Sequence, residues 1–451
     1  MDDALRHTLD LRFRLGLFDP VEFQPYWTAI SEKDIRSDDH QARAVDATEQ
    51  SFVLLRNEKN TLPFQAGKRV LVTGPHADDR GAILGNYIGE ICPDGTFNCV
   101  TSPFEAIQAM NNKSNGTTIL EPGCQSVTST NTSEFQATLD AAKKSDMIVF
   151  VGGLDTTVER ESMDRHNVGL PGVQGDLLKE LVELKIPLVV VLYHGGIVTF
   201  DSDLLSKIPA LISAGYPGFY GADCMAKMLF DEDDRLAVNR FGKSTVTWYV
   251  FFCFLYHRCR HIPRLIHTHT HTHTHRYSDA GWKDAKFDML DFDMKTSPGR
   301  TYRYYTGEPE FPFAFGLSYA ETSTKIVSHQ NDGNGVSVTI EITNHDKNRT
   351  TDEIVTLFAT AQSGVIDSSE PASQVQTSLV AFERVGPIAP SSSNTTVTLR
   401  VDPDVIALTD TDGHSKVYTG KYNIFLSVSS NDDDDDNSVV VECDKGSCSV
   451  A

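Results

Sequence analysis

Four acidic and two basic side chains are concentrated in one short segment of this 451-residue sequence. The segment is GGLDTTVERESMDRHNVGLPGVQ, residues 152–174, and it contains Asp155, Glu159, Arg160, Glu161, Asp164 and Arg165. Hydrolysis of an acetal needs one carboxylic acid to protonate the leaving oxygen and a second carboxylate to attack or stabilise the resulting cation. A nearby arginine can hydrogen-bond hydroxyl groups or keep a carboxylate ionised. The segment therefore has the residue types of acetal hydrolysis, although a polar surface loop can collect the same types.

A second group of reactive side chains is the run HTHTHTHTH, His267 to His275, with histidine at every other position. Alternate side chains of an extended strand share one face, so these histidines could line up as zinc or nickel ligands. A structural metal site, however, usually mixes ligand types at turn-compatible spacings. A disordered low-complexity loop is the plainer interpretation.

The elements around residues 152–174 predict where this segment lies. From residue 68 on, helical patterns alternate with four apolar runs that end in glycine: RVLVTGP, DMIVFVGG, IPLVVVLYHGG and ALISAGYPG. Such runs indicate a mostly parallel sheet with helices on both faces, so the fold class is α/β. Ligands bind at the carboxyl ends of parallel strands, which is where residues 152–174 fall. A nucleotide-binding fold is disfavoured, because no G-x-G-x-x-G or Walker pattern follows the first strand.

The flanking regions differ in pattern. Residues 5–15 predict one amphipathic helix, and residues 40–64 predict a second helix that runs into a turn. After residue 330, five segments alternate with period two, which predicts an all-β sandwich of the immunoglobulin or fibronectin type. The aspartate run 432–436 is expected in a turn or tail, as a solvated charge run rather than a calcium site.

Composition limits the partners and the compartment. The formal net charge of −22 argues against nucleic acid or an anionic membrane surface as a partner. The cysteine pairs Cys92/Cys99 and Cys443/Cys448 could each close a short loop, or remain buried thiols. Glycosylation sequons begin at Asn112, Asn115, Asn131, Asn348 and Asn394 and favour a secreted protein. The chain nevertheless opens without an apolar signal segment, so we expect either an intracellular protein or a missing N-terminus.

Taken together, the motifs resemble the later part of glycoside hydrolase family 3, in particular its β-xylosidase-like branch. The resemblance extends over about residues 10–430 apart from one gap. The motifs follow the family order: LRFRLGLFDP, ATEQSFVLLRNEKNTLPF, RVLVTGPHAD, LGNYIG, VGGLDTTVERESMDRHNVGLPGVQ, SAGYPGFYGADCMAKMLF, STVTWY and PGRTYRYYTGEPEFPFAFGLSYA. The domains that it implies are the last helix of a (β/α)8 barrel plus linker (1–45), an α/β sandwich (46–320), a fibronectin type III-like β-sandwich (321–440) and a tail (441–451).

The resemblance also implies a reaction and its residues. Family members hydrolyse β-linked sugars with retention of configuration, without a cofactor, in a site between the barrel and the α/β sandwich. The nucleophile is an aspartate on the barrel, and the acid/base glutamate comes from the loop that reads VERESMDR here. Glu161 is the expected acid/base because it lies closest before Asp164 and Arg165, and Glu159 is the alternative. Asp164 and Arg165 are candidates for substrate binding, although we expect them to shape the loop. Further pocket candidates, each with a structural role as the alternative, are Asn86, Tyr87 and His194.

The sequence departs from the family because almost the whole barrel is absent, and the nucleophile with it. A retaining mechanism needs two carboxyl groups about 5–5.5 Å apart. We therefore expect a fragment of a secreted β-xylosidase or β-glucosidase that is inactive alone. Its parent would act on terminal β-linked sugars of plant-wall oligosaccharides, with neither nucleic acid nor membrane as a partner. The alternative is a non-catalytic module for carbohydrate binding or partner interaction.

The gap in the resemblance contains the histidine run. Family members continue almost directly from STVTWY to YSDAGWK, whereas residues 250–276 intervene here with no Asp or Glu, four Arg and seven of the fifteen His. A (CA)n repeat read in frame encodes alternating histidine and threonine, and the codon of Val250 begins with the GT that opens introns. We therefore interpret residues 250–276 as a retained intron, with a disordered loop as the alternative, and expect no metal site.

Overall fold

A computed structural model describes residues 1–165, 167–231, 240–249, 293–296, 299–307, 309–366, 375–392, 395–410, 412–426, 437–444 and 446–451. Segment 250–276, the aspartate run 432–436 and the sequon at Asn394 lie outside the described residues. The chain divides into two compact units, Met1–Thr48 and Glu49–Ala451.

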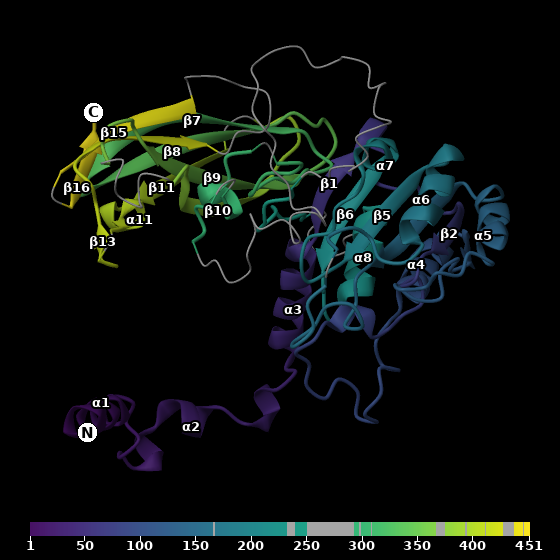
Figure 1. Ribbon diagram of the computed structural model, residues 1–451, viewed down its shortest axis with the longest axis horizontal. Coiled ribbons are helices and arrows are strands. Elements are labelled where there is room, and N and C mark those ends of the chain that lie inside the picture. Colours follow the sequence, from purple (N-terminus) through teal and green to yellow (C-terminus); the bar gives the residue numbers. More distant parts are fainter. Residues whose placement is uncertain are drawn as a thin grey trace. The chain divides into compact units, whose positions relative to one another are not determined.

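The first unit consists of short helices: α1 (Asp2–Arg14), η1 (Val21–Phe23), α2 (Pro25–Ala29) and η2 (Glu32–Asp34), followed by the start of α3 (Asp38–Ser51) (Figure 1). The amphipathic helix that the sequence predicts at residues 5–15 is α1, and Gly16 takes a positive φ of 69° just beyond it. No residue of α1 is buried, and its apolar side chains Leu5, Leu11 and Phe13 are exposed.

The second unit begins with a six-stranded sheet in the order β1-β6-β5-β4-β2-β3. Its strands are β1 (Val53–Asn57), β2 (Arg69–Thr73), β3 (Thr117–Leu120), β4 (Met147–Gly153), β5 (Leu188–Tyr193) and β6 (Ala210–Gly215). All neighbours pair in parallel except β1, which pairs antiparallel with β6. The predicted α/β class and mostly parallel sheet are confirmed. The prediction for residues 40–64 missed β1, because a short apolar run beside a helix does not reveal a strand.

Helices cover both faces of this sheet. α4 (Pro103–Asn112) packs against α8 (Gly221–Phe230), while α6 (Gln174–Glu183) contacts both α5 (Phe135–Ala142) and α7 (Ser202–Lys207). Side chains of α5, α6 and α7 form one core cluster with alternate strand residues such as Ile148 and Phe150. α4 begins at a capping box, in which Ser102 accepts a hydrogen bond from the backbone of Glu105 and Glu105 accepts one in return. Because helices cover the sheet on both faces, its strands are buried, which explains why apolar runs alternate with helical patterns in the sequence.

The rest of the second unit is a β-sandwich. One sheet has the order β10-β9-β14-β15-β16 and the other β11-β8-β7. The strands are β7 (Thr322–Asp332), β8 (Gly335–Asn344), β9 (Thr351–Ala361), β10 (Ser378–Ile388), β11 (Thr395–Val401), β14 (Gly420–Leu426), β15 (Ser438–Asp444) and β16 (Ser447–Val450). Smaller elements are α10 (Thr301–Tyr304), α11 (Pro403–Ile406), β12 (Leu408–Thr409) and β13 (Ser415–Lys416). Residues 441–451, expected as a tail, instead complete β15 and form β16, because their apolar residues pack into the sandwich core.

Two cysteine pairs form disulfides, and the described sequon asparagines lie on the surface. Cys92–Cys99 and Cys443–Cys448 are both bonded, whereas Cys124 and Cys224 are buried and take no part in these disulfides. The sequon asparagines inside the described residues, all exposed, are Asn112, Asn115, Asn131 and Asn348. None of the helices in the described ranges is long and apolar enough to cross a membrane.

Candidate active site

The loop between β4 and α6 turns back on itself in a tight hairpin. The backbones of Arg160 and Met163 exchange two hydrogen bonds, of 3.1 and 2.9 Å. Glu161 and Ser162 therefore form the tip, and Ser162 has the positive φ of 64° that closes the turn. The glutamate is exposed at this tip. The loop thus presents Glu161 at the carboxyl end of the sheet, as the sequence predicts for a candidate site.

Tyr87 is the side chain that contacts Glu161, donating a hydrogen bond from its hydroxyl to the carboxylate. It comes from the loop that follows β2, and the residue is 83% exposed. The contact with Glu161 raises the pKa of Tyr87, because ionising the phenol would break the hydrogen bond. The sequence placed Tyr87 among speculative pocket residues, and the structure brings it to the proposed acid/base.

Glu159, the alternative, lies in a different environment. Its Oε2 is 2.7 Å from Nε of Arg165, and its Oε1 accepts a 2.7 Å hydrogen bond from the backbone N–H of Gly196. Gly195 and Gly196 allow this approach, because a Cβ on either would lie 2.8 Å from a Glu159 or Arg165 atom. Glu159 therefore anchors the loop to the turn after β5.

Arg165 and Asp164, the residues suggested for substrate binding, also lie in different environments. Arg165 pairs with Glu159 and donates from its guanidinium to the carbonyl of Ile197, with 11% of its side chain exposed. Asp164 is exposed on the loop. The expectation that Arg165 shapes the loop agrees with these contacts.

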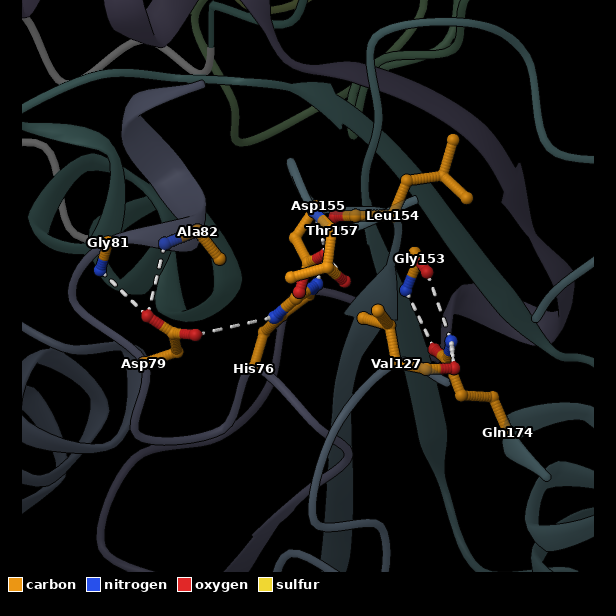
Figure 2. A network of polar contacts seen from close by, with 10 residues as sticks. All are labelled: His76, Asp79, Gly81, Ala82, Val127, Gly153, Leu154, Asp155, Thr157 and Gln174. Carbon is orange, nitrogen blue, oxygen red and sulfur yellow. Dashed lines mark hydrogen bonds and ion pairs between the residues drawn. The ribbon is translucent and has the colours of Figure 1, made fainter. Parts of the chain in front are cut away.

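Gln174 fixes both ends of the loop and was not singled out in the sequence (Figure 2). Its Oε1 accepts from the N–H of Gly153 at 2.8 Å, and its Nε2 donates to the carbonyls of Gly153, Val127 and Pro171 at 3.0, 3.2 and 3.2 Å. The side chain is fully buried. Its signal in the sequence was weak: a polar residue at the start of a helix, directly after LPG.

His194, another pocket candidate, is a buried structural residue. Nε2 lies 2.8 Å from Oγ of Ser213, and the ring meets Trp248 edge to face. Burial, reinforced by the charge of Arg165, lowers the pKa of His194 to about 4. The imidazole is therefore neutral in the folded protein at neutral pH.

This burial predicts acid sensitivity. An unfolded histidine titrates near 6.5, so between pH 4 and 6.5 the unfolded chain binds the proton more tightly. The stabilising effect is complete above pH 6.5 and is lost as the pH falls towards 4, by at most about 3 kcal/mol. His194→Gln should flatten the free energy of unfolding over this range in urea titrations. Exposed His329→Gln is the control, and equal slopes in wild type and His194→Gln would contradict the prediction.

Within the described ranges, one group of three ligand-type side chains lies close enough to hold an ion: Asp410, Asp412 and His414. It belongs to the turn between β12 and β13 of the sandwich, and two of its members are exposed. Exposed acidic groups commonly cluster without an ion, so we assign no function to this cluster.

The chain thus combines an α/β domain, which carries a carboxylate-bearing loop at the carboxyl end of the inner strand β4, with a β-sandwich that follows it. The sequence profile described as the glycosyl hydrolase family 3 C-terminal domain matches residues 52–319. The chain belongs to glycoside hydrolase family 3.

Curated relatives and solved structures agree with this assignment. Beta-D-xylosidase 1 of Arabidopsis thaliana is 33% identical over 70% of this chain and 36% of its own length. A probable exo-1,4-beta-xylosidase of Aspergillus terreus is 29% identical over 96% of this chain and 51% of its own. Among solved structures, a family 3 exo-beta-xylosidase bound to a xylobiose aziridine probe superposes with a TM-score of 0.72, at 27% identity, over 95% of this chain and 51% of that one. The chain thus spans about half, or less, of the length of the relatives that it matches.

Proposed function

We propose that this chain supplies the acid/base residue of a retaining, exo-acting β-glycosidase, and that this residue is Glu161. The supporting observation is the hairpin between Arg160 and Met163, which presents an exposed carboxylate at the carboxyl end of a parallel sheet. An acid/base must give a proton to the leaving oxygen and then take one from water, so it must be accessible.

Glu159 fits this role poorly. One of its oxygens is held by Arg165 and the other by the N–H of Gly196, and only 26% of its side chain is exposed. Neither oxygen is free to approach a leaving group without breaking the anchor of the loop. Glu159 and Arg165 are therefore positioning residues in this proposal.

The proposed substrates are terminal β-linked sugars of plant-wall oligosaccharides. The relatives named above are a β-D-xylosidase and an exo-1,4-β-xylosidase, which favours xylose, with glucose as the other candidate. The bonded cysteine pairs and the exposed sequon asparagines favour a secreted protein. No cofactor enters this chemistry.

The second carboxylate of the mechanism, the nucleophile, is proposed to lie outside these 451 residues. Retaining glycosidases place the two carboxyl groups about 5–5.5 Å apart. Among the described residues, the side chain that hydrogen-bonds to Glu161 is the phenol of Tyr87 and not a second carboxylate. The resemblance assigns the nucleophile to the barrel, which would complete the site.

Adding the barrel is therefore expected to create activity. The chain alone should not hydrolyse 4-nitrophenyl β-xyloside or β-glucoside above the background rate. Joined to the N-terminal half of the Aspergillus terreus relative, it should turn over at least one of them. Turnover by the chain alone that Glu161→Gln abolishes would contradict the proposed division of the site. A folded, joined enzyme without turnover would favour the non-catalytic module instead.

A further inference from the structure

A large cavity adjoins the Glu161 hairpin and takes no part in the proposed chemistry. Its volume is about 1140 Å³, and its walls come from the loops that follow β2, β3 and β4. The chain continues from β2 to β3 on one side, and β4 lies on the other side of β2. A crevice at such a reversal of strand order, outside the carboxyl ends of the strands, is where open α/β sheets bind ligands.

The cavity borders both loops that meet at the contact between Tyr87 and Glu161. Asn86 and Ile88 line it and flank Tyr87 in the sequence, while Arg160 lines it and directly precedes Glu161. Tyr87 and Glu161 themselves lie outside the cavity lining, so the cavity adjoins the Glu161 carboxylate one residue away along both loops. A ligand that fills the cavity and also reaches the Glu161 carboxylate must therefore be longer than a single sugar.

The charged side chains that line the cavity disfavour anionic ligands. Two arginines, Arg80 and Arg160, are outnumbered by five carboxylates: Asp78, Asp79, Glu121, Glu134 and Asp155. Arg80 is already occupied by Glu105 and the carbonyl of Val100, and Arg160 donates to the carbonyl of Thr156. The negative excess disfavours an anionic ligand, whereas carboxylates readily accept hydrogen bonds from hydroxyl groups.

One wall of the cavity is apolar. Phe97 and Ile88 line it and remain 39% and 41% exposed. A Cβ on Gly81 would lie 3.1 Å from the Phe97 ring, so the ring rests directly on that backbone, and the disulfide Cys92–Cys99 closes the loop that carries it. A fixed ring beside hydrogen-bonding groups suits a pyranose, which has an apolar C–H face and a hydroxyl rim.

We propose that this cavity is a binding site for neutral sugar residues of an oligosaccharide whose end reaches Glu161, and that it rejects chains substituted with uronic acid. The assignment of the oligosaccharide rests on the proposed function. The site itself rests on the cavity, the Phe97 wall and the negative lining.

Calorimetric titration of the 451-residue chain tests this site. Xylotetraose should bind, and the same backbone bearing one 4-O-methylglucuronic acid should bind about tenfold more weakly at low salt. That difference should shrink at about 0.5 M NaCl, where exposed charges are screened. Phe97→Ala should weaken xylotetraose binding about tenfold or more, whereas Phe382→Ala, an exposed phenylalanine on β10, should leave it unchanged.

Glu121→Arg provides an independent variant and should narrow the discrimination against the acidic ligand. Absence of xylotetraose binding, equal affinity for both ligands, or equal behaviour of Phe97→Ala and Phe382→Ala would each overturn the proposal. If Phe97→Ala does not fold, the Glu121→Arg result decides. Loss of turnover in the joined Glu161→Gln enzyme tests the proposed function separately. If the 451-residue chain binds xylotetraose normally but the joined enzyme keeps full turnover in Glu161→Gln, the proposed function is refuted. The proposed binding site in the cavity is then still supported.

Discussion

Replacing Glu161 with glutamine in the joined enzyme is expected to lower kcat/KM for 4-methoxyphenyl β-xyloside by about 10²–10⁴-fold. Glutamine keeps the shape of the hairpin tip and can still accept the hydrogen bond from Tyr87, but it cannot transfer a proton. The loss should therefore be chemical rather than structural. The measurement is steady-state kinetics on the two enzymes, with matched circular dichroism melts.

The dependence on the leaving group separates proton transfer from other causes. A 2,4-dinitrophenolate leaves without protonation, so cleavage of the glycosidic bond in Glu161→Gln should be nearly normal with that substrate. Hydrolysis of the glycosyl-enzyme should stay slow, because water has lost its base. Azide needs no base, so it should attack the anomeric carbon, displace the nucleophilic carboxylate and restore turnover as the glycosyl azide.

Glu159→Gln is the matched control, two residues away in the same loop. It weakens the contacts with Arg165 and Gly196, so it should lower the stability of the loop without azide rescue. Azide rescue in Glu159→Gln, together with ordinary kinetics in Glu161→Gln, would reverse the assignment of the two glutamates.

Gln174→Ala is expected to lower the free energy of unfolding by about 3 kcal/mol or more. The change removes four hydrogen bonds in a fully buried place and leaves the N–H and carbonyl of Gly153 without this partner. Unsatisfied buried backbone groups cost about 1–3 kcal/mol each. Chemical denaturation followed by circular dichroism measures the effect.

Gln136→Ala is the control for this change. Gln136 lies on the exposed side of α5, and its side chain donates to Asp140 one turn along the same helix. Its replacement should change the free energy of unfolding by less than about 0.5 kcal/mol. Equal losses in the two variants would show that the Gln174 network does not hold the loop.

The sequence predicted the sheet well because its signal is local. Runs such as MIVFVGG and LVVVLY are apolar on both faces, which only a covered parallel strand tolerates. β1, β3, β7, β15 and β16 were missed for the opposite reason, since each is defined by the strand that it pairs with. Pairing partners far apart in the chain leave no periodicity in a single segment.

The site was predicted only in part. The carboxylates of residues 152–174 were visible as residue types, and their loop position followed from the strand before them. The distinction between Glu159 and Glu161 needed the glycine turn after β5, more than thirty residues later. The contact between Tyr87 and Glu161 joins loops that no spacing rule connects. The interpretation of residues 250–276 as a retained intron stays a prediction, which sequencing of the transcript across that junction will test.

The disulfide Cys92–Cys99 makes the expression host a variable in every binding measurement. The disulfide closes a short loop, so its loss should lower the free energy of unfolding by only about 2 kcal/mol. The core cluster of the sheet does not depend on this bond, because neither of the two cysteines belongs to it. In a reducing cytosol the sheet would still form, while the loop with Phe97 would lose its closure. Protein from an oxidising secretory pathway is therefore the proper reference sample. Two preparations that differ in the redox state of this disulfide would differ in sugar binding even though their sequences are identical.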